Sequence, residues 1–381
     1  MTSKTLIVLA AALAMLALVA VLGQREDAPQ TQVNTLFLPE LEASLGDIDR
    51  VRVVRAGNET VATLERGPES WGIAEKQGYP ADIAKIRGAL LALAEARIVE
   101  QKTANPEYYE RLGVAPVESE DTRGIELTAY AGDDVRASVI VGDSDAANLQ
   151  YVRASDAETS YLVDRKIDVP RDAVGWIDTS ILDVSSSRVA SVTIEHPDGE
   201  TVRIKKDAED QTNFSVEDVP EGRELSYPGV ANVIANTLRD LRLDDVAAAD
   251  GELPDETTRT TFQTFDGLVV TATSFERDGG QWVRFEAAVA EDGAGDGDEA
   301  DAASSEPAAE ADGDSAGPAE AAEAAGEDEK DEDADVDVPA EAEQINARVS
   351  GWEYQIPSYL FGQLTRRMED LLRAVEDDDT E

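Results

Sequence analysis

The stretch WGIAEKQGYPADIAKIRGALLALAEARIVE, residues 71–100, holds a short strand-like segment, a Tyr-Pro pair and an amphipathic helical pattern. Proline is favoured in the first turn of a helix, because its missing N–H would have no partner there. The apolar residues that follow recur at the spacing of one helical face: Ile83, Ile86, Leu90 and Leu93. This pattern predicts a helix that opens at Tyr79-Pro80 and buries one face.

A second stretch, ELSYPGVANVIANTLRDLRLDDV at residues 224–246, repeats the Tyr-Pro pair and the apolar spacing. Three apolar positions lie at the same distance from the proline in both stretches: Ile86, Leu90 and Leu93 in the first, and Ile234, Leu238 and Leu241 in the second. A second helix is therefore predicted to open at Tyr227-Pro228.

Strand patterns flank the two predicted helices in the same order. Each helix is preceded by a hairpin pattern and a short strand, and it is followed by two more hairpin patterns. The preceding hairpins occupy residues 50–67 and 188–207, and the next pair occupies residues 123–142 and 260–275. Alternating apolar residues and turn signals such as AGN and HPDG support these assignments.

The last hairpin differs between the two halves. QYVRASDAETSYLVD, residues 150–164, turns back at once, whereas residues 291–344 separate QWVRFEAAVA from SGWEYQIP in the second half. Residues 291–343 contain 22 Asp or Glu and a single Lys. Such a composition buries too little apolar surface to offset the entropy lost when the chain becomes ordered. The entropic cost of closing a loop rises only slowly with its length, so a hairpin can accommodate a long insert. We expect a disordered acidic insert, whose removal over 291–343 leaves the fold intact.

Together these patterns predict an α+β fold of two tandem, internally duplicated antiparallel-sheet-plus-helix modules, residues 47–184 and 185–375. A helix over SYLFGQLTRRMEDLLRAVED, residues 358–377, is predicted to close the second module. Aromatic residues at matching places of the two halves are predicted to anchor the cores: Trp71, Tyr79, Tyr151 and Tyr161, and Phe214, Tyr227, Trp282 and Trp352 or Tyr354.

Residues 5–22, TLIVLAAALAMLALVAVL, carry no charge and follow Lys4. As a helix this run is about 27 Å long, close to the hydrocarbon thickness of a membrane. With Lys4 held inside, the positive-inside rule exports the rest of the chain. We expect a signal anchor over 1–23 and a tether over 24–46, and thus a single-pass protein of the cytoplasmic membrane whose bulk is periplasmic. A cleavable signal peptide is the alternative.

The net charge of -48 argues against nucleic-acid binding, because an acidic surface repels phosphates. Arg outnumbers Lys, and together with abundant Asp and Glu this is typical of a halophilic composition, in which salt screens self-repulsion. The chain has no Cys, which excludes disulfides, thiolate metal sites, a Cys nucleophile and a lipidated Cys.

The order of several motifs resembles a known family. LFLPELEASLGDIDRVRVV at 36–54 is followed by the W-x-I…GYPAD pattern of 71–82, by VIVGDSDAANLQYVR at 139–153 and by YLVD at 161–164. This series resembles the bacterial domain-of-unknown-function 4340 (DUF4340) family of membrane-anchored envelope proteins. The resemblance implies an accessory role rather than an enzymatic one, because members are often encoded beside an ABC transporter and a gliding-motility-type auxiliary subunit.

The residues offer few candidates for chemistry. The single histidine, His196, lies in the predicted turn HPDG, where a general base is not expected. Asp143 and Asp145 form an acid pair that suits a solvated turn better than a two-carboxylate site. The segment DGAGDGDEAD, residues 292–301, lacks the spacing of a calcium loop. No catalytic, cofactor-binding or metal-binding residue is assigned, and no cofactor is expected.

Two functions remain open. The first is a non-enzymatic accessory protein, anchored through residues 5–22, that binds an envelope partner such as an ABC-transporter permease or auxiliary subunit. The second is an envelope hydrolase or ligand-binding protein that uses carboxylates in the cleft between the two modules. The first is favoured, because the sequence shows no nucleophile with an adjacent base and no metal-ligand spacing.

Overall fold

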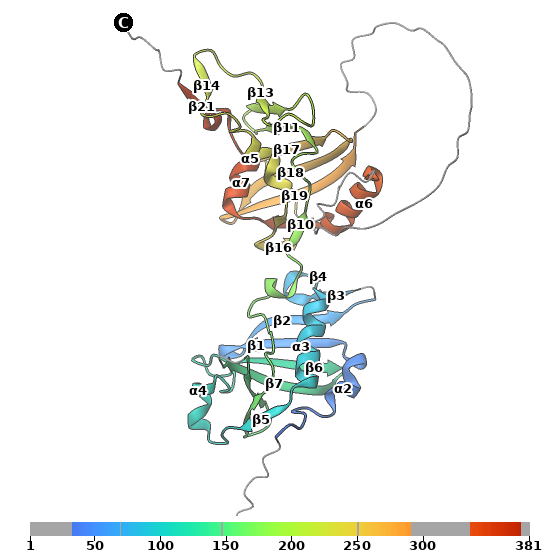
Figure 1. Cartoon of the computed structure of the whole chain (residues 1–381), viewed down its shortest axis with the longest axis vertical. Helices are drawn as coiled ribbons and strands as arrows, with labels where there is room; N and C mark the ends of the chain where they lie inside the picture. Colours follow the sequence, from blue (N-terminus) through green and yellow to red (C-terminus); the bar gives the residue numbers. More distant parts are fainter. Residues whose placement is uncertain (1–32, 69, 146–147, 250, 291–335, 375–381) are drawn as a thin grey trace, which may run out of the picture. The chain divides into compact units, whose positions relative to one another are not determined.

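The computed structural model describes residues 33–290 and 336–374, apart from residues 69, 146–147 and 250 (Figure 1). The chain divides into two compact units: unit 1 comprises the residues up to Thr179 together with Val246–Ala248, and unit 2 comprises Ser180–Asp245 and the residues from Ala249 onward. The described parts of both units are mostly sheet with few helices, and their strands pair antiparallel. The prediction of a mixed fold dominated by antiparallel sheet is confirmed at this level.

Unit 1 contains a nine-stranded sheet in the order β4-β3-β2-β1-β6-β7-β8-β9-β5. Its strands are β1 (Arg50–Arg55), β2 (Glu59–Arg66), β3 (Trp71–Ile73), β4 (Tyr79–Pro80), β5 (Ile98–Gln101), β6 (Ile125–Ala131), β7 (Asp134–Ser144), β8 (Gln150–Ala154) and β9 (Ser160–Val163). The predicted hairpin of β1 and β2 is confirmed, with Val51 opposite Leu64. It turns through η2 (Ala56–Asn58), where Gly57 has a φ of 73° that glycine adopts without strain.

Helix α3 (Ile83–Glu95) begins later than the sequence predicts. Tyr79 and Pro80 form strand β4 instead, because Tyr79 pairs with Ile73 of β3. The helix starts after Asp82, whose side chain accepts hydrogen bonds from the N–H groups of Ala84 at 2.8 Å and Lys85 at 3.3 Å. The predicted apolar face is buried at Ile86, Leu90 and Leu93, whereas Ile83 is 41% exposed.

The predicted tether, residues 24–46, is partly ordered against unit 1. Residues 41–44 form α2 (Leu41–Ser44), which continues into the 3-10 helix η1 (Leu45–Asp47), and Leu41 is buried. Leu36 forms an isolated β-bridge with Arg97. The other short helical elements of unit 1 are η3 (Ala74–Lys76), η4 (Pro106–Tyr108), α4 (Tyr109–Leu112) and η5 (Val174–Trp176).

Unit 2 contains an eight-stranded sheet in the order β13-β12-β11-β17-β18-β19-β20-β16. Its strands are β11 (Val189–Glu195), β12 (Thr201–Lys205), β13 (Ser215–Val216), β16 (Asp245–Ala248), β17 (Thr257–Thr264), β18 (Leu268–Arg277), β19 (Gly280–Val289) and β20 (Trp352–Gln355). Two small sheets accompany it: β10 (Ser180–Leu182) with β15 (Leu241–Arg242), and β14 (Arg223–Leu225) with β21 (Leu372–Ala374).

The two large sheets share one strand order. Numbered along the chain, β3-β2-β1-β6-β7-β8-β9-β5 matches β13-β12-β11-β17-β18-β19-β20-β16 place for place, and β4 adds a ninth strand in unit 1. In both sheets the strand that follows the helical segment crosses to the far edge, beside the last strand of the meander.

The second predicted helix is much shorter than expected. The chain forms only α5 (Asn232–Ala235) and the 3-10 helix η6 (Asn236–Leu238), and Tyr227-Pro228 precedes both. Gly229 has a φ of 82° and Asp240 a φ of 46°, so the backbone leaves helical geometry on both sides. Ile234, Leu238 and Leu241 are nevertheless buried, although Leu241 lies in strand β15.

Part of the predicted acidic insert is folded. Residues 338–344, expected to be disordered, belong to helix α6 (Val338–Val349), which Asp337 caps by accepting from the Ala340 N–H at 3.2 Å. The amide of Asn346 donates to the Ala287 carbonyl at 2.7 Å and accepts from the Ala287 N–H at 2.9 Å. The helix thereby satisfies backbone groups of β19 beyond the short strand β20. Residues 291–335 lie outside the described residues.

The predicted helix over 358–377 is broken. Helix α7 (Ser358–Leu364) ends where the Thr365 hydroxyl donates to the Phe361 carbonyl at 3.0 Å. The 3-10 helix η7 (Met368–Leu371) and strand β21 follow.

Among the residues that the structure describes, no helix combines the length and the apolar character of a membrane span. The predicted span, residues 5–22, lies outside them.

Candidate functional site

The histidine of the chain lies beside a groove of about 610 Å³ in unit 2, which we call the histidine groove. Its lining includes His196, Thr258, Ser274, Phe361 and Arg367, with three carboxylates: Asp255, Glu256 and Glu276. Thr258 of β17 lies directly opposite Ser274 of β18, so both side chains occupy one face of the sheet. Four separate segments supply the groove: the β11–β12 turn, the segment before β17, the sheet, and the end of α7 with the residues that follow it.

The imidazole of His196 is only 8% exposed, and both of its nitrogens have neighbours. Nδ1 lies 3.4 Å from the Thr258 hydroxyl, and Nε2 lies 3.3 Å from the Arg366 carbonyl. A neutral ring protonated at Nε2 satisfies both contacts, since Nε2 then donates and Nδ1 accepts. A general base needs a ring nitrogen directed at substrate. The geometry of His196 favours a structural role, in which the imidazole links the β11–β12 turn to the segment after α7.

Ser274 is the most deeply buried polar residue of the groove, at 1% exposure. Its hydroxyl has no hydrogen-bond partner among the described residues. A serine nucleophile requires a base within about 3.2 Å. The described residues place Ser274 and His196 in the same groove without that contact.

Arg367 of this groove is held by two carboxylates. Its guanidinium pairs with Asp198 at 2.8 Å and with Glu200, which also accepts from the Met368 N–H at 2.8 Å. The backbone N–H of Glu200 and then the guanidinium of Arg367 lower the pKa of Asp198. These contacts fasten the turn that carries His196 to the segment that follows α7.

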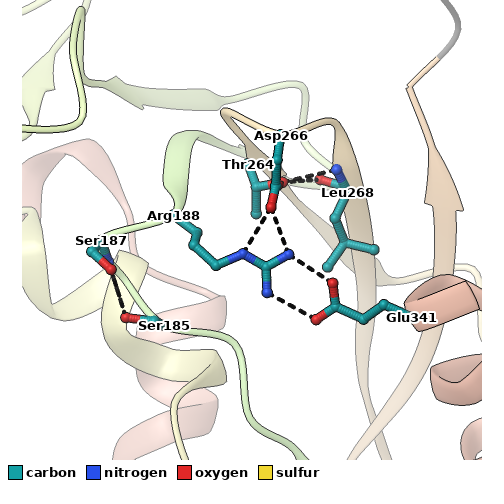
Figure 2. Close-up of polar contacts among 7 residues, drawn as sticks. All are labelled: Ser185, Ser187, Arg188, Thr264, Asp266, Leu268 and Glu341. Carbon is teal, nitrogen blue, oxygen red and sulfur yellow. Dashed lines mark hydrogen bonds and ion pairs between the residues drawn. The ribbon is translucent and has the colours of Figure 1, made fainter. Parts of the chain in front are cut away.

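A second cluster, the Arg188 cluster, joins three parts of unit 2 (Figure 2). The guanidinium of Arg188 lies between the carboxylates of Asp266, in the β17–β18 turn, and Glu341, in α6. It donates to both oxygens of Glu341, at 2.9 and 2.6 Å, and to Asp266 at 2.9 Å. The Thr264 hydroxyl donates to Asp266 and accepts from the Leu268 N–H at 2.8 Å.

The charges of the Arg188 cluster reinforce one another. Hydrogen bonds to Glu341 raise the pKa of Arg188, against the cost of its partial burial. Loss of hydration opposes ionisation of Asp266, but hydrogen bonds from Thr264 and Arg188 outweigh it, so the pKa of Asp266 is lowered. A bidentate arginine–carboxylate pair is among the stronger polar contacts in proteins, and this pair attaches α6 to the start of β11.

Replacing Arg188 with methionine is expected to lower the free energy of unfolding of unit 2 by about 2–3 kcal/mol, because hydrogen bonds to charged groups are lost from a partly buried carboxylate. Urea unfolding followed by circular dichroism measures the change. Arg203→Met is the matched control: Arg203 pairs with Asp218 at 3.6 Å through exposed side chains. It should cost less than about 1 kcal/mol.

The same variant has a pH signature. Since the pKa of Asp266 is lower in the folded state, its contribution to stability is present above the unfolded value of about 3.9 and is lost as pH falls through the folded value. Without Arg188, stability should decline less steeply in this acidic range. If Arg188→Met and Arg203→Met lower the free energy of unfolding equally and have parallel pH profiles, the Arg188 cluster stabilises unit 2 no more than an exposed ion pair does.

The remaining sequence candidates have ordinary surroundings. Asp143 forms an ion pair with Arg123 at 2.6 Å, and Asp145 lies in the loop that follows β7. Within the described residues no group of three or more His, Asp or Glu side chains could hold a metal ion. The Gly/Asp-rich segment 292–301 lies outside them.

The aromatic prediction holds in part. The buried members are Trp71, Tyr79, Phe214 and Tyr354, whereas Tyr227 is exposed. Sequence reasoning missed Thr258 and Ser274. The available signal for Thr258 is that three of the four buried positions on its face of β17 are threonines, Thr258, Thr260 and Thr264, with Phe262 as the fourth.

The hydrolase alternative requires a carboxylic acid kept protonated by its surroundings. Four described carboxylates have a lowered pKa: Glu59, Asp198, Glu217 and Asp266. Each accepts a hydrogen bond from a cationic side chain. These groups stay ionised at neutral pH, so they suit ion pairing and not proton donation.

The fold and these sites define a two-unit α+β protein built mainly of antiparallel sheet. Residues 71–260 match the family model described as Domain of unknown function (DUF4340). The match begins in β3 of unit 1, ends in β17 of unit 2 and covers about half of the chain. The resemblance to the DUF4340 family is thus confirmed over this segment. Comparisons with curated proteins and with solved structures returned no match.

Proposed function

We propose that the chain is a non-enzymatic accessory protein, anchored by residues 5–22 to the outer side of the cytoplasmic membrane, whose folded units bind a protein partner. The uncharged run after Lys4 supports the anchor. The resemblance to the DUF4340 family supports the kind of partner, a subunit of an ABC-transporter or gliding-motility-type complex.

We also infer that the two units arose by internal duplication. The identical order of eight strands in the two large sheets supports this, because unrelated meanders have no reason to send the strand after the helical segment to the same edge. The recurrence of Gln-aromatic-Val-Arg at residues 150–153 of β8 and 281–284 of β19 supports it further. The duplicated fold supplies two similar platforms for binding.

The observation that carries the binding role is the exposure of large apolar side chains on helices of unit 2. Tyr359, at the start of α7, is 68% exposed, and Val233 of α5 is 41% exposed. Helices α5 and α7 contact each other. Hydration of exposed apolar surface is unfavourable in free energy, and such surface is typical of partner-binding sites.

Substituting Tyr359→Ser and Val233→Ser together is expected to reduce partner recovery about tenfold, since aromatic anchors contribute most to interfaces. The measurement is affinity capture of the tagged full-length chain from detergent-solubilised membranes of its native host, followed by quantitative mass spectrometry. A chain without residues 1–23 should move to the soluble fraction and recover no membrane partner.

Val135→Ser is the control, because Val135 is exposed on β7 of unit 1. It should capture the same proteins as the unaltered chain. Equal recovery with the double variant would remove the binding role from these helices. Membrane association of the chain without residues 1–23 would contradict the anchor.

A further inference from the structure

The floor of the histidine groove carries a hydroxyl that the protein itself does not satisfy. Ser274 is 1% exposed, and no group among the described residues forms a hydrogen bond with its hydroxyl. Burial of a polar group without a partner is unfavourable in free energy and is rare in native proteins. A polar group of a ligand in the groove would supply the partner that is lacking.

A second hydroxyl accompanies the first. Thr258 of β17 lies directly opposite Ser274 of β18, and side chains paired in this way have Cβ atoms about 5 Å apart. When the His196 ring is protonated at Nε2, the Thr258 hydroxyl donates to Nδ1. The lone pairs of the Thr258 oxygen then stay available as acceptors. The floor therefore offers two neighbouring oxygen acceptors.

The lining of the groove is negatively charged. Three exposed carboxylates line it, and none of them has an ion-pair partner among the described residues: Asp255, Glu256 and Glu276. The guanidinium of Arg367, also in the lining, is already paired with Asp198 and Glu200. Even with Arg366 counted, the groove and its rim hold five carboxylates and two guanidinium groups.

Three arginines of the neighbouring strands do not offset this charge: Arg259, Arg277 and Arg284. They alternate with Thr258 and Ser274 in the sheet and therefore face its other side. They have acidic neighbours there, since Glu195 of β11 lies directly opposite Arg259, and Glu353 pairs with the other two. The negative charge of the groove is thus left for a ligand to balance.

This lining suits an ammonium group better than a metal ion. Within the described residues no group of three or more His, Asp or Glu side chains could hold a metal. An alkylammonium group carries three N–H donors and no acceptor, which matches hydroxyl and carboxylate oxygens. Pro197, Pro254 and Phe361 add apolar surface for methylene groups, and a groove of about 610 Å³ suits a small molecule.

We propose that the histidine groove binds a small organic diamine or polyamine. One ammonium group donates to the hydroxyl oxygens of Ser274 and Thr258, and the carboxylates of Glu256 and Glu276 attract the positive charges at the rim. The site shares no residue with Tyr359 and Val233, which carry the proposed partner role, so either proposal can fail without the other.

His196 is the single histidine of the chain, so its imidazole signals report on this groove without further assignment. The full-length, ¹⁵N-labelled chain in detergent, with a tag free of histidine, is titrated with putrescine and with spermidine at constant ionic strength and followed by NMR. At least one amine should change the His196 signals saturably. Tetramethylammonium, which has the charge but no N–H donor, should bind about tenfold more weakly or not at all.

Ser274→Ala separates a ligand-binding role from a structural one. The substitution removes a hydroxyl that has no partner in the unliganded protein, so the melting temperature should not fall. Amine binding should nevertheless weaken about tenfold, because a hydrogen bond to a charged group is lost. Glu276→Gln should weaken binding about threefold through the loss of one charge.

Glu286→Gln is the matched control for charge, because Glu286 lies opposite Thr271 and so faces the other side of the sheet. It should leave the dissociation constant within about twofold of that of the unaltered chain. The proposal is overturned if neither amine changes the His196 signals saturably, or if Ser274→Ala binds like the unaltered chain. It is equally overturned if tetramethylammonium binds as well as the amines, or if Glu286→Gln and Glu276→Gln weaken binding alike.

Discussion

Replacing Glu353 with alanine is expected to lower the free energy of unfolding of unit 2 by about 3–5 kcal/mol, the cost of breaking a buried ion pair. Glu353 lies in β20 at 0% exposure, between the guanidinium groups of Arg277 and Arg284. Its removal leaves two partly buried cations without the carboxylate that they share. Urea unfolding followed by tryptophan fluorescence suits the measurement, because the Arg277 guanidinium lies 5.3 Å from the centre of the Trp282 ring.

Glu276→Ala is the control for this prediction, because Glu276 is an exposed acid next to Arg277 in sequence. It should change stability by less than about 0.5 kcal/mol. A triple variant, Glu353→Leu with Arg277→Met and Arg284→Met, should recover much of the loss, since apolar residues can replace a buried ionic cluster without penalty. If Glu353→Ala and Glu276→Ala are equally stable, the carboxylate has no structural role.

Two deletions that differ only in residues 336–343 are expected to have very different effects. Each replaces the deleted residues by about ten Gly and Ser residues, long enough to act as a flexible linker. Deletion of 291–335 should leave the melting temperature nearly unchanged. Deletion of 291–343 also removes Val338, Glu341 and Ala342 of α6, and it should cost about 3–6 kcal/mol through lost apolar burial and lost hydrogen bonds to Arg188.

Differential scanning calorimetry of the two deletions gives the comparison. Adding Arg188→Met to the shorter deletion should reproduce part of the loss seen in the longer one, because both remove the same contact. Adding it to the longer deletion should have little further effect, since Glu341 is already absent. Identical melting temperatures of the two deletions would mean that α6 does not stabilise the sheet. The prediction from composition, that all of 291–343 can be removed without loss of the fold, would then be correct.

Local patterns predicted the hairpins because the information for each lies within one short segment. Alternation of Val51 and Val53 with polar neighbours, and the Gly57 turn, are sufficient to place β1 and β2. The same reasoning placed the hairpin that carries His196. Helix starts were predicted less well. Tyr79-Pro80 suits both a helix start and a strand, and the pairing of Tyr79 with Ile73 selected the strand.

The prediction of disorder from composition was wrong for residues 338–344, because helix α6 is stabilised by contacts with residues distant in the sequence. The sequence of α6 resembles the acidic residues before it, and its order comes from contacts of Glu341 with Arg188 and of Asn346 with Ala287. The candidate sites follow the same rule. That His196 lies in a turn is visible in the sequence, but its contacts with Thr258 and the Arg366 carbonyl come from other strands and from the segment after α7.

Two arginines at matching places in the two sheets show which features the sequence determined and which the tertiary structure decided. Gln-aromatic-Val-Arg places Arg153 and Arg284 on matching strands, and alternation alone assigns each to a face of its sheet. Arg153 is buried and donates to the carbonyls of Val114 at 2.9 Å and Ala157 at 2.7 Å, and burial lowers its pKa. Arg284 instead meets the carboxylate of Glu353. The strand and its spacing are local properties, but the partner of a buried charge is supplied by whichever distant segment the fold brings to it.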